Sequence, residues 1–259
     1  IFDNGGCCVF GDEDTLSLLL GMMNSVVFEV LYSQINPTLN FQSGDVARVP
    51  FVKPKSEYKS IKIVNDLVDI YAMEYASFEC SWDFSRINLV EINPNSKKLS
   101  EAWDILSKKI ELMFNTATQL EEDNNRIFIE AYGLQDELSP EVPESQITLA
   151  RADREKDSQR LISYAIGCMM GRYSLDESGL IYAHAGNVGF EPGRYATFPA
   201  DADGIVPITD ELWFADDAPS RIREFLRAVW GPQKFDTLLV KSRFPRPGLL
   251  MNSRTYLSF

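Results

Sequence analysis

The first strong feature along the chain is a dense apolar run from Leu16 to Leu31. Asp12 stands just before it as an N-capping side chain, and Pro37 follows it as a residue that a helix cannot continue through. The pattern predicts one buried helix. Its expected apolar face is Leu16, Leu19, Leu20, Met23, Val26, Val27 and Val30. Its small polar face, expected to lie close to a neighbouring element, is Ser17, Gly21, Asn24 and Ser25.

Two longer stretches repeat apolar residues at alternating steps of three and four, which is typical of a heptad seam. The first seam, within residues 57–78, comprises Ile61, Val64, Val68, Tyr71, Tyr75 and Phe78. The second comprises Leu99, Trp103, Leu106, Ile110, Met113, Ala117 and Leu120, and continues more weakly to Leu134. The simplest solution is an antiparallel pair in which each helix buries the other's stripe. Two helices packed against other elements would show similar spacing.

The rest of the chain alternates helical and irregular patterns. Residues 1–11 are typical of the tail of a β-rich unit, and residues 174–208 predict loops with short strands. Further helices are expected over residues 151–172 and 218–230. The expected fold class is therefore α+β, mainly α with small β elements. We divide it into residues 1–54, a helical spacer at 55–134, a helical and loop-rich domain at 135–231, and a divergent or truncated tail at 232–259.

Charge narrows the possible functions. The chain has 259 residues, with 25 Lys and Arg against 38 Asp and Glu, so its formal net charge is −13. Such an acidic chain is a poor general binder of nucleic acid, because phosphate affinity requires clustered cations. Any DNA contact must therefore be local. Acids concentrate in residues 121–144 and 201–217, which predict solvated surface or a docking face for a basic partner.

The polar, turn-rich stretch at residues 35–50, INPTLNFQSGDVARVP, separates the apolar run from a short basic segment. Amide side chains suit adenine and guanidinium suits guanine, so Asn40, Gln42 and Arg48 are candidates for reading bases. Phosphate contacts would come from Lys53, Lys55, Lys59 and Lys62. The alternatives are a structural connector with a buried Phe41, and a solvated basic helix start.

Five long strings carry a resemblance, in one order along residues 12–231. They are LLLGMMNS (18–25) with the 35–50 stretch, SWDF (81–84), NNRIFIEAYGLQDELSPEVP (124–143), RLISYAIGCMMGRYSLDESGLIYAHAG (160–186) and FPADADGIVPITDELWFADD (198–217). Together they resemble the PglX-like adenine-specific DNA methyltransferases of BREX phage-defence systems. The resemblance implies the C-terminal part of a parent that methylates adenine N6 in a non-palindromic site with S-adenosylmethionine.

The same resemblance implies the end of a target-recognition domain, a helical spacer and a C-terminal domain. The parent's partners would be double-stranded DNA, the N-terminal methyltransferase domain of the same protein and other BREX proteins. A rival hypothesis is a non-enzymatic module that docks defence proteins through its acidic faces and touches no DNA. A cofactor turn and an Asn-Pro-Pro-aromatic motif upstream of Ile1 would favour the first hypothesis.

Catalytic and metal motifs are not recognisable in the sequence. The runs at residues 36–39 and 93–96, NPTL and NPNS, lack the second proline and the aromatic ring of the family's motif, and are typical of a helix stop and a turn. Gly186 and Gly189 belong to a plain turn. His184, the one histidine, has no partner at a recognisable spacing. We expect no catalytic residue, no bound cofactor and no metal in this segment, and we expect it to be inactive alone.

The cysteines indicate the cellular compartment in which the protein is expected. Cys7, Cys8, Cys80 and Cys168 show no C-x-x-C spacing and are typical of reduced residues in a cytoplasmic protein. The longest apolar run is shorter than a membrane span, and no signal peptide is visible. The chain begins at Ile1 without a methionine, which favours a fragment of a longer cytoplasmic protein without a membrane segment.

Overall fold

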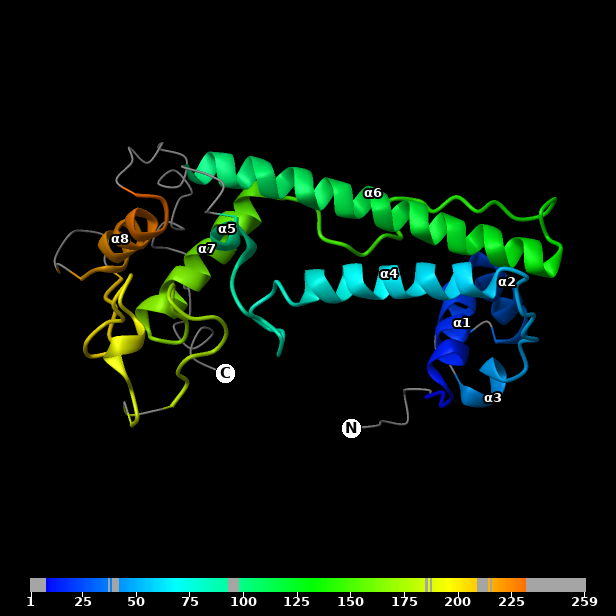
Figure 1. Cartoon of the computed structure of the whole chain (residues 1–259), viewed down its shortest axis with the longest axis horizontal. Helices are drawn as coiled ribbons and strands as arrows, with labels where there is room; N and C mark the ends of the chain where they lie inside the picture. The colour runs from blue at the N-terminus through cyan, green and yellow to red at the C-terminus, as the bar shows by residue number, and fades with distance from the viewer. Residues whose placement is uncertain are drawn as a thin grey trace. The chain divides into compact units, whose positions relative to one another are not determined.

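The computed structural model describes residues 8–36, 38, 42–92, 98–184, 186, 188–208, 214 and 216–231. Two compact units emerge: unit 1 comprises residues 1–82 and 107–151, and unit 2 comprises residues 83–106 and 152–259. The helices are α1 (Glu13–Met23), α2 (Val26–Ile35), α3 (Ser43–Val46), α4 (Glu57–Tyr75), α5 (Asn88–Glu91), α6 (Leu99–Tyr132), α7 (Arg154–Met169), the 3-10 turn η3 (Pro192–Arg194) and α8 (Ala218–Trp230) (Figure 1).

The expectation of small β elements is wrong, because none of the described residues lies in a strand. The irregular backbone of unit 2 makes isolated hydrogen bonds instead of ladders: Ile181 N donates to Arg172 O at 2.9 Å, and Gly179 N donates to Ser85 O at 2.8 Å. Gly179 and Gly189 also take positive φ angles, which turn the chain before a strand can extend. The described fold is therefore helical, with long ordered loops.

The predicted first helix is two helices. Asp12 caps α1 as expected, its Oδ1 accepting from Thr15 N at 3.0 Å. Ser25 then starts α2 by accepting from Phe28 N at 3.4 Å, and the two axes differ by 74°. The helix ends at Ile35, before Pro37, as predicted. Within the described part of the chain, no single helix has the length and apolarity to cross a membrane, although the bent α1–α2 pair together meets those two criteria.

The prediction of a closely packed small polar face is only partly correct, because Ser17, Gly21 and Ser25 are buried whereas Asn24 is exposed. Asn124 of α6 donates from Nδ2 to Gly21 O at 2.8 Å, and Asn125 Oδ1 accepts from Val26 N at 2.9 Å. The predicted apolar face is only partly correct, because Leu20 and Val30 are exposed. The buried core around this region is formed by Met22, Val27, Phe28, Tyr32, Val49, Ile63, Ile127, Phe128 and Ile129.

Helices α4 and α6 run in opposite directions in unit 1, as the two seams predicted (Figure 1). The inward positions of α6 are correct, since each seam residue from Leu99 to Leu120 is buried or half-buried. The inward positions predicted for α4 are partly wrong, because Val68 is 48% exposed and Tyr75 is 55% exposed. The buried side of α4 carries Ser60, Ile63 and Val64, followed by the partly buried Leu67, Ile70 and Tyr71.

A third segment takes part in this packing. Ile147 and Leu149 are buried with Phe114 and Ala117 of α6, and the partly buried residues of α4 pack against the same cluster. The loop before α7 therefore contributes to the core that α4 and α6 share, whereas the sequence predicted that the two helices would bury only each other. The four-part division made from the sequence stays a prediction.

Unit 2 is built around aromatic rings. Tyr164 of α7 is fully buried and stacks on Tyr173 with ring centroids 5.2 Å apart. Phe84 and Phe225 contact the same ring edge to face. The helices expected over residues 151–172 and 218–230 are confirmed as α7 and α8. The predicted tail at 232–259 lies outside the described residues.

Candidate nucleic-acid interface

The loop after α2 is anchored by the buried Asn36. Its Nδ2 donates to Asp45 Oδ2 at 2.9 Å, and its Oδ1 accepts from Thr38 N at 2.9 Å. The Tyr32 hydroxyl accepts from Gln42 N at 3.3 Å, which fixes the backbone where α3 begins. The Gln42 side chain is exposed. The other predicted base-reading amide, Asn40, lies outside the described residues, as does Phe41.

A second anchor holds the end of this loop. Tyr132, the last residue of α6, donates its hydroxyl hydrogen to Pro50 O. The same hydroxyl accepts from Val52 N at 3.1 Å. Burial raises the pKa of Tyr132, so its hydroxyl stays protonated and able to donate at neutral pH. The structure thus ties the predicted basic segment to a long helix of unit 1.

The predicted cations are exposed, and three of them are paired. Arg48 lies 3.6 Å from Asp45, and Lys53 lies 3.0 Å from Glu57. Such surface pairs contribute about 0–1 kcal/mol each, so a phosphate could replace the carboxylate at small cost.

The remaining lysines lie on and just before α4. Lys59 approaches Asp123 of α6 at 4.0 Å. Lys55 and Lys62 are exposed and make no ion pair with another residue that the structure describes. Lys59 and Lys62 are three residues apart, which places them on one side of the helix. Gln42, Arg48 and these lysines all belong to unit 1.

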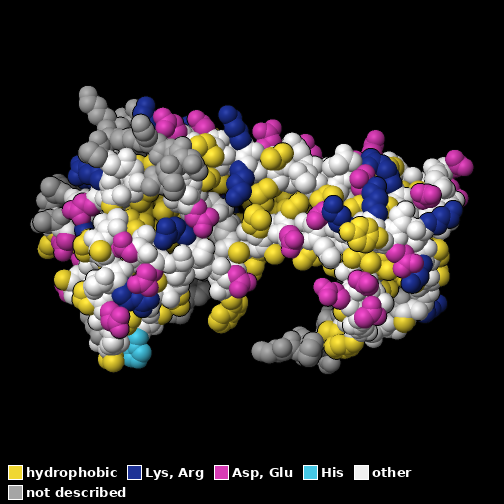
Figure 2. Space-filling model, viewed as in Figure 1, with side chains coloured by type: hydrophobic (Ala, Val, Ile, Leu, Met, Phe, Trp, Pro, Cys, Tyr) yellow, Lys and Arg dark blue, Asp and Glu magenta, His cyan; other side chains and the backbone are white. Residues whose placement is uncertain are grey.

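Acidic side chains limit the size of this cationic surface. Arg126 of α6 is bound to Glu122 at 3.0 Å and to Asp123. Figure 2 shows Lys and Arg side chains interspersed with Asp and Glu rather than gathered into one broad basic patch. The face drawn in Figure 2 therefore offers local contacts to a phosphate backbone rather than a wide cationic surface.

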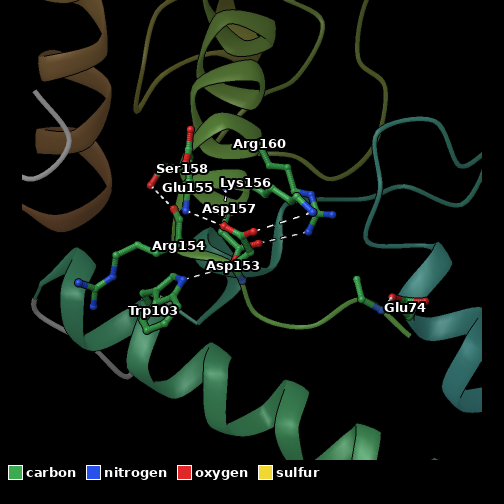
Figure 3. A network of polar contacts seen from close by, with 10 residues as sticks. Glu74, Trp103, Asp153, Arg154, Glu155, Lys156, Asp157, Ser158 and Arg160 are labelled. Atoms are coloured by element: carbon green, nitrogen blue, oxygen red, sulfur yellow. Dashed lines mark hydrogen bonds and ion pairs between the residues drawn. The ribbon is translucent and has the colours of Figure 1, made fainter. Parts of the chain in front are cut away.

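Sequence reasoning missed a polar network in unit 2, shown in Figure 3. The buried carboxylate of Asp157 accepts from Trp103 Nε1 at 3.2 Å, from Arg160 Nη1 at 3.2 Å and from Asp153 N at 3.2 Å. The guanidinium of Arg154 lies over the Trp103 ring at 4.4 Å. The bond between Trp103 and Asp157 joins residues 54 positions apart, so it depends on the fold and leaves no signal in the sequence. This network joins the start of α6 to the start of α7.

The residues considered for metal chemistry do not assemble. Within the described ranges, no group of three or more His, Cys, Asp and Glu side chains could hold a metal ion. His184 is exposed in an irregular part of unit 2. Gly186 and Gly189 take φ angles of 76° and 75°, which fits their prediction as turn residues. The predicted turn at residues 93–96 lies outside the described residues.

No protein-family model matches the chain. It is similar to the adenine-specific methyltransferase BrxX of Escherichia coli O9:H4 (strain HS), with 36% identity over 255 residues that cover 90% of this chain and 21% of that protein. It is also similar to the adenine-specific methyltransferase PglX of Lacticaseibacillus casei (strain Zhang), with 34% identity over 242 residues that cover 91% of this chain and 20% of that protein. The chain spans about a fifth of the length of these curated relatives. The resemblance to PglX-like adenine-specific methyltransferases is thereby confirmed over nine tenths of the chain.

Proposed function

We propose that this chain is the C-terminal DNA-recognition and spacer segment of a site-specific adenine-N6 DNA methyltransferase that acts in phage defence. The observation that carries the proposal is the identity of 36% over 255 residues to a protein named as an adenine-specific methyltransferase. The parent would use S-adenosylmethionine, bound by polypeptide other than this segment. The segment would position the DNA and supply none of the reacting groups.

The DNA contact would lie on the anchored loop and the start of α4. Gln42 and Arg48, together with Asn40, would read base edges, because amides pair with adenine and guanidinium pairs with guanine. Lys53, Lys55, Lys59 and Lys62 would contact phosphates and set the register of the loop on the duplex. The bonds from Tyr32 and Tyr132 to the loop backbone support this assignment, since a base-reading side chain needs a fixed backbone.

The partners would be double-stranded DNA and the methyltransferase domain of the same polypeptide. Other BREX proteins would complete the assembly. The small number of local cations on a chain of net charge −13 fits a segment that adds DNA contacts to those of a larger protein.

The test is a triple substitution, Lys55→Ala, Lys59→Ala and Lys62→Ala, in the full-length protein. Binding to a duplex that carries the methylation site is measured at several salt concentrations. Each lost phosphate contact reduces the steepness of the log–log salt dependence by about 0.9, so we expect a reduction of roughly 2 to 3 and weaker binding to all sequences.

The matched control removes the same charge elsewhere, with Lys108→Ala, Lys109→Ala and Lys156→Ala. These lysines are exposed on α6 and α7, and their loss should leave the salt dependence unchanged. Equal affinity and equal slope for the triple variant and the unmodified protein would contradict the DNA contact.

A second candidate function is a docking module without DNA contact. The pairing of Arg48, Lys53 and Lys59 with carboxylates favours it, because these cations are already partly neutralised. The salt-dependence experiment separates the two functions.

A further inference from the structure

Helix α4 carries two apolar stripes, and the structure buries only one of them. The second stripe contains Val68, Ala72 and Tyr75, which follow one another at steps of four and three and therefore share one flank. Val68 and Tyr75 are about half exposed, and Trp82 just beyond the helix is fully exposed. All four belong to unit 1. A fully exposed tryptophan that follows a half-exposed stripe along the chain is more typical of a contact surface than of scattered surface apolar residues.

The chain segment that carries this stripe is acidic, which disfavours nucleic acid as its partner. Residues 63–85 contain five acids and no Lys or Arg. A phosphate backbone would be repelled here, whereas it would be attracted at Lys55, Lys59 and Lys62 near the start of the same helix. The complementary surface must therefore be apolar at its centre and basic at its rim.

The size of the stripe indicates how the partner is held. The exposed side chain of Trp82, together with the exposed halves of Tyr75 and Val68, offers roughly 400 Å² of accessible apolar surface. A stable complex of separate proteins buries about 800 Å² on each partner. A surface this small is sufficient when the partner is tethered, because the effective concentration of a linked segment reaches the millimolar range.

We propose that the stripe of Val68, Ala72, Tyr75 and Trp82 docks a basic-rimmed apolar surface on another part of the same longer polypeptide. This proposal rests on the proposed function in one respect: it requires the 259 residues to belong to a longer methyltransferase. The relatives of similar sequence are about five times as long as the part that matches this chain. Helix α4 then has two roles: its first turns face DNA, and its last turns receive the remainder of the protein.

The test places a photocrosslinking residue in the stripe of the full-length protein, as Ala72→p-benzoylphenylalanine. After irradiation, peptide mapping by mass spectrometry identifies the crosslinked segment. We expect an intramolecular crosslink to a segment outside these 259 residues. Its yield should fall several-fold in about 1 M salt, which screens the basic rim.

Two companion variants also carry the crosslinker. The first adds both Trp82→Ser and Tyr75→Ser, and the second, the control, adds Leu112→Ser. Leu112 is an exposed apolar residue of α6 in the same unit. The stripe variants should reduce crosslinking several-fold, and the control should not. Folding is checked by circular dichroism, and exposed positions should tolerate these changes.

A crosslink to a second copy, to another protein or to residues within the 259, or no crosslink at all, would overturn the proposal. The readout requires no methyl transfer. A full-length protein that crosslinks as expected but leaves adenine unmethylated would contradict the proposed function and leave the docking intact.

Discussion

Gly21 is a position where a single methyl group has a calculable effect. A Cβ atom there would lie 2.9 Å from Asn124 Oδ1 and 2.9 Å from Val64 Cγ2, inside van der Waals contact. Gly21→Ala should cost about 1–3 kcal/mol through overpacking, which exceeds the gain of about 1 kcal/mol in helix propensity. Urea unfolding of the full chain measures the result. Gly44→Ala is the control, because nothing lies within 4 Å of its Cβ; equal stabilities for the two variants would contradict the close packing.

Glu121 links stability to pH. Its Oε1 accepts from the Tyr71 hydroxyl at 2.6 Å, and burial raises the pKa of Glu121 above its ordinary 4.5. The folded state therefore holds the proton more tightly, so this group's contribution to stability falls as pH rises from 4.5 through the raised pKa. Burial also raises the pKa of Tyr71 to about 12, which keeps its hydroxyl a donor throughout.

Glu121→Gln keeps the acceptor and removes the buried charge. We expect this variant to be more stable at about pH 8 by up to about 1 kcal/mol, a value reduced because the side chain is only partly buried. The difference should shrink as the pH is lowered through the raised pKa of Glu121 toward 4.5. Chemical denaturation across this range checks it, with Glu111→Gln, an exposed neighbour on α6, as the control. A pH-independent difference would refute the assignment.

Individual residues were predictable where the chemistry is local. Asp12 caps α1 because its carboxylate needs only the next turn of the same helix. Gln42 and Arg48 could be placed on an ordered loop, but the bonds that order it come from Tyr32 and from Tyr132, which is 80 residues away from Val52. Such a partnership leaves no periodic signal in one sequence.

At the scale of elements, the end of α6 positions the candidate DNA segment. Tyr132→Phe keeps the ring but removes the hydroxyl that bonds Pro50 O and Val52 N. A net hydrogen bond contributes about 1 kcal/mol, so the amide of Val52 should exchange roughly fivefold faster. Hydrogen exchange with mass spectrometry measures this, and Tyr58→Phe, at an exposed ring, is the control. Unchanged exchange around residues 50–53 would count against the anchor.

The junction of α6 and α7 depends on a buried carboxylate. Trp103→Phe removes the Nε1–H that Asp157 accepts, and a buried acceptor that loses a donor costs about 1–3 kcal/mol. Thermal unfolding should show the loss, whereas Trp82→Phe at the fully exposed indole should be neutral. Equal melting temperatures for both variants would contradict a structural role for this network.

The spacing of apolar residues predicted where the long helices lie, but it did not always predict which side of a helix is buried. The α6 pattern identified its inward side correctly because most of its outward positions are polar, Leu112 and Ile105 being exceptions. Helix α4 has apolar residues on two flanks, and spacing cannot say which flank is buried. The break between α1 and α2 was missed because Asn24 and Ser25 were interpreted as members of a packing face. Ser25 acts as a cap, which competes with helix continuation.

For the whole molecule, the central prediction is a division of labour. The isolated 259-residue chain, incubated with S-adenosylmethionine that carries a labelled methyl group, should leave duplex adenine unlabelled. The full-length protein should label it. Transfer by the isolated chain would place reacting groups within these residues and contradict the proposal.

The fold class as a whole was predicted wrongly because loop composition was interpreted as evidence of strands. Aromatic and glycine-rich stretches in unit 2 pack as irregular backbone around Tyr164 and Tyr173 instead of pairing with one another. Whether such a stretch becomes a strand depends on finding a second strand beside it, and that is a property of the complete fold.

The boundary between Leu106 and Ser107 falls inside α6, so each unit is assembled from two separated stretches of polypeptide. A chain that ends at residue 151 therefore keeps all of unit 1, but it also carries residues 83–106 without the rest of unit 2. To express unit 1 by itself, residue 82 must be spliced to residue 107 through an engineered linker, and a protease that releases either unit must cut within a helix.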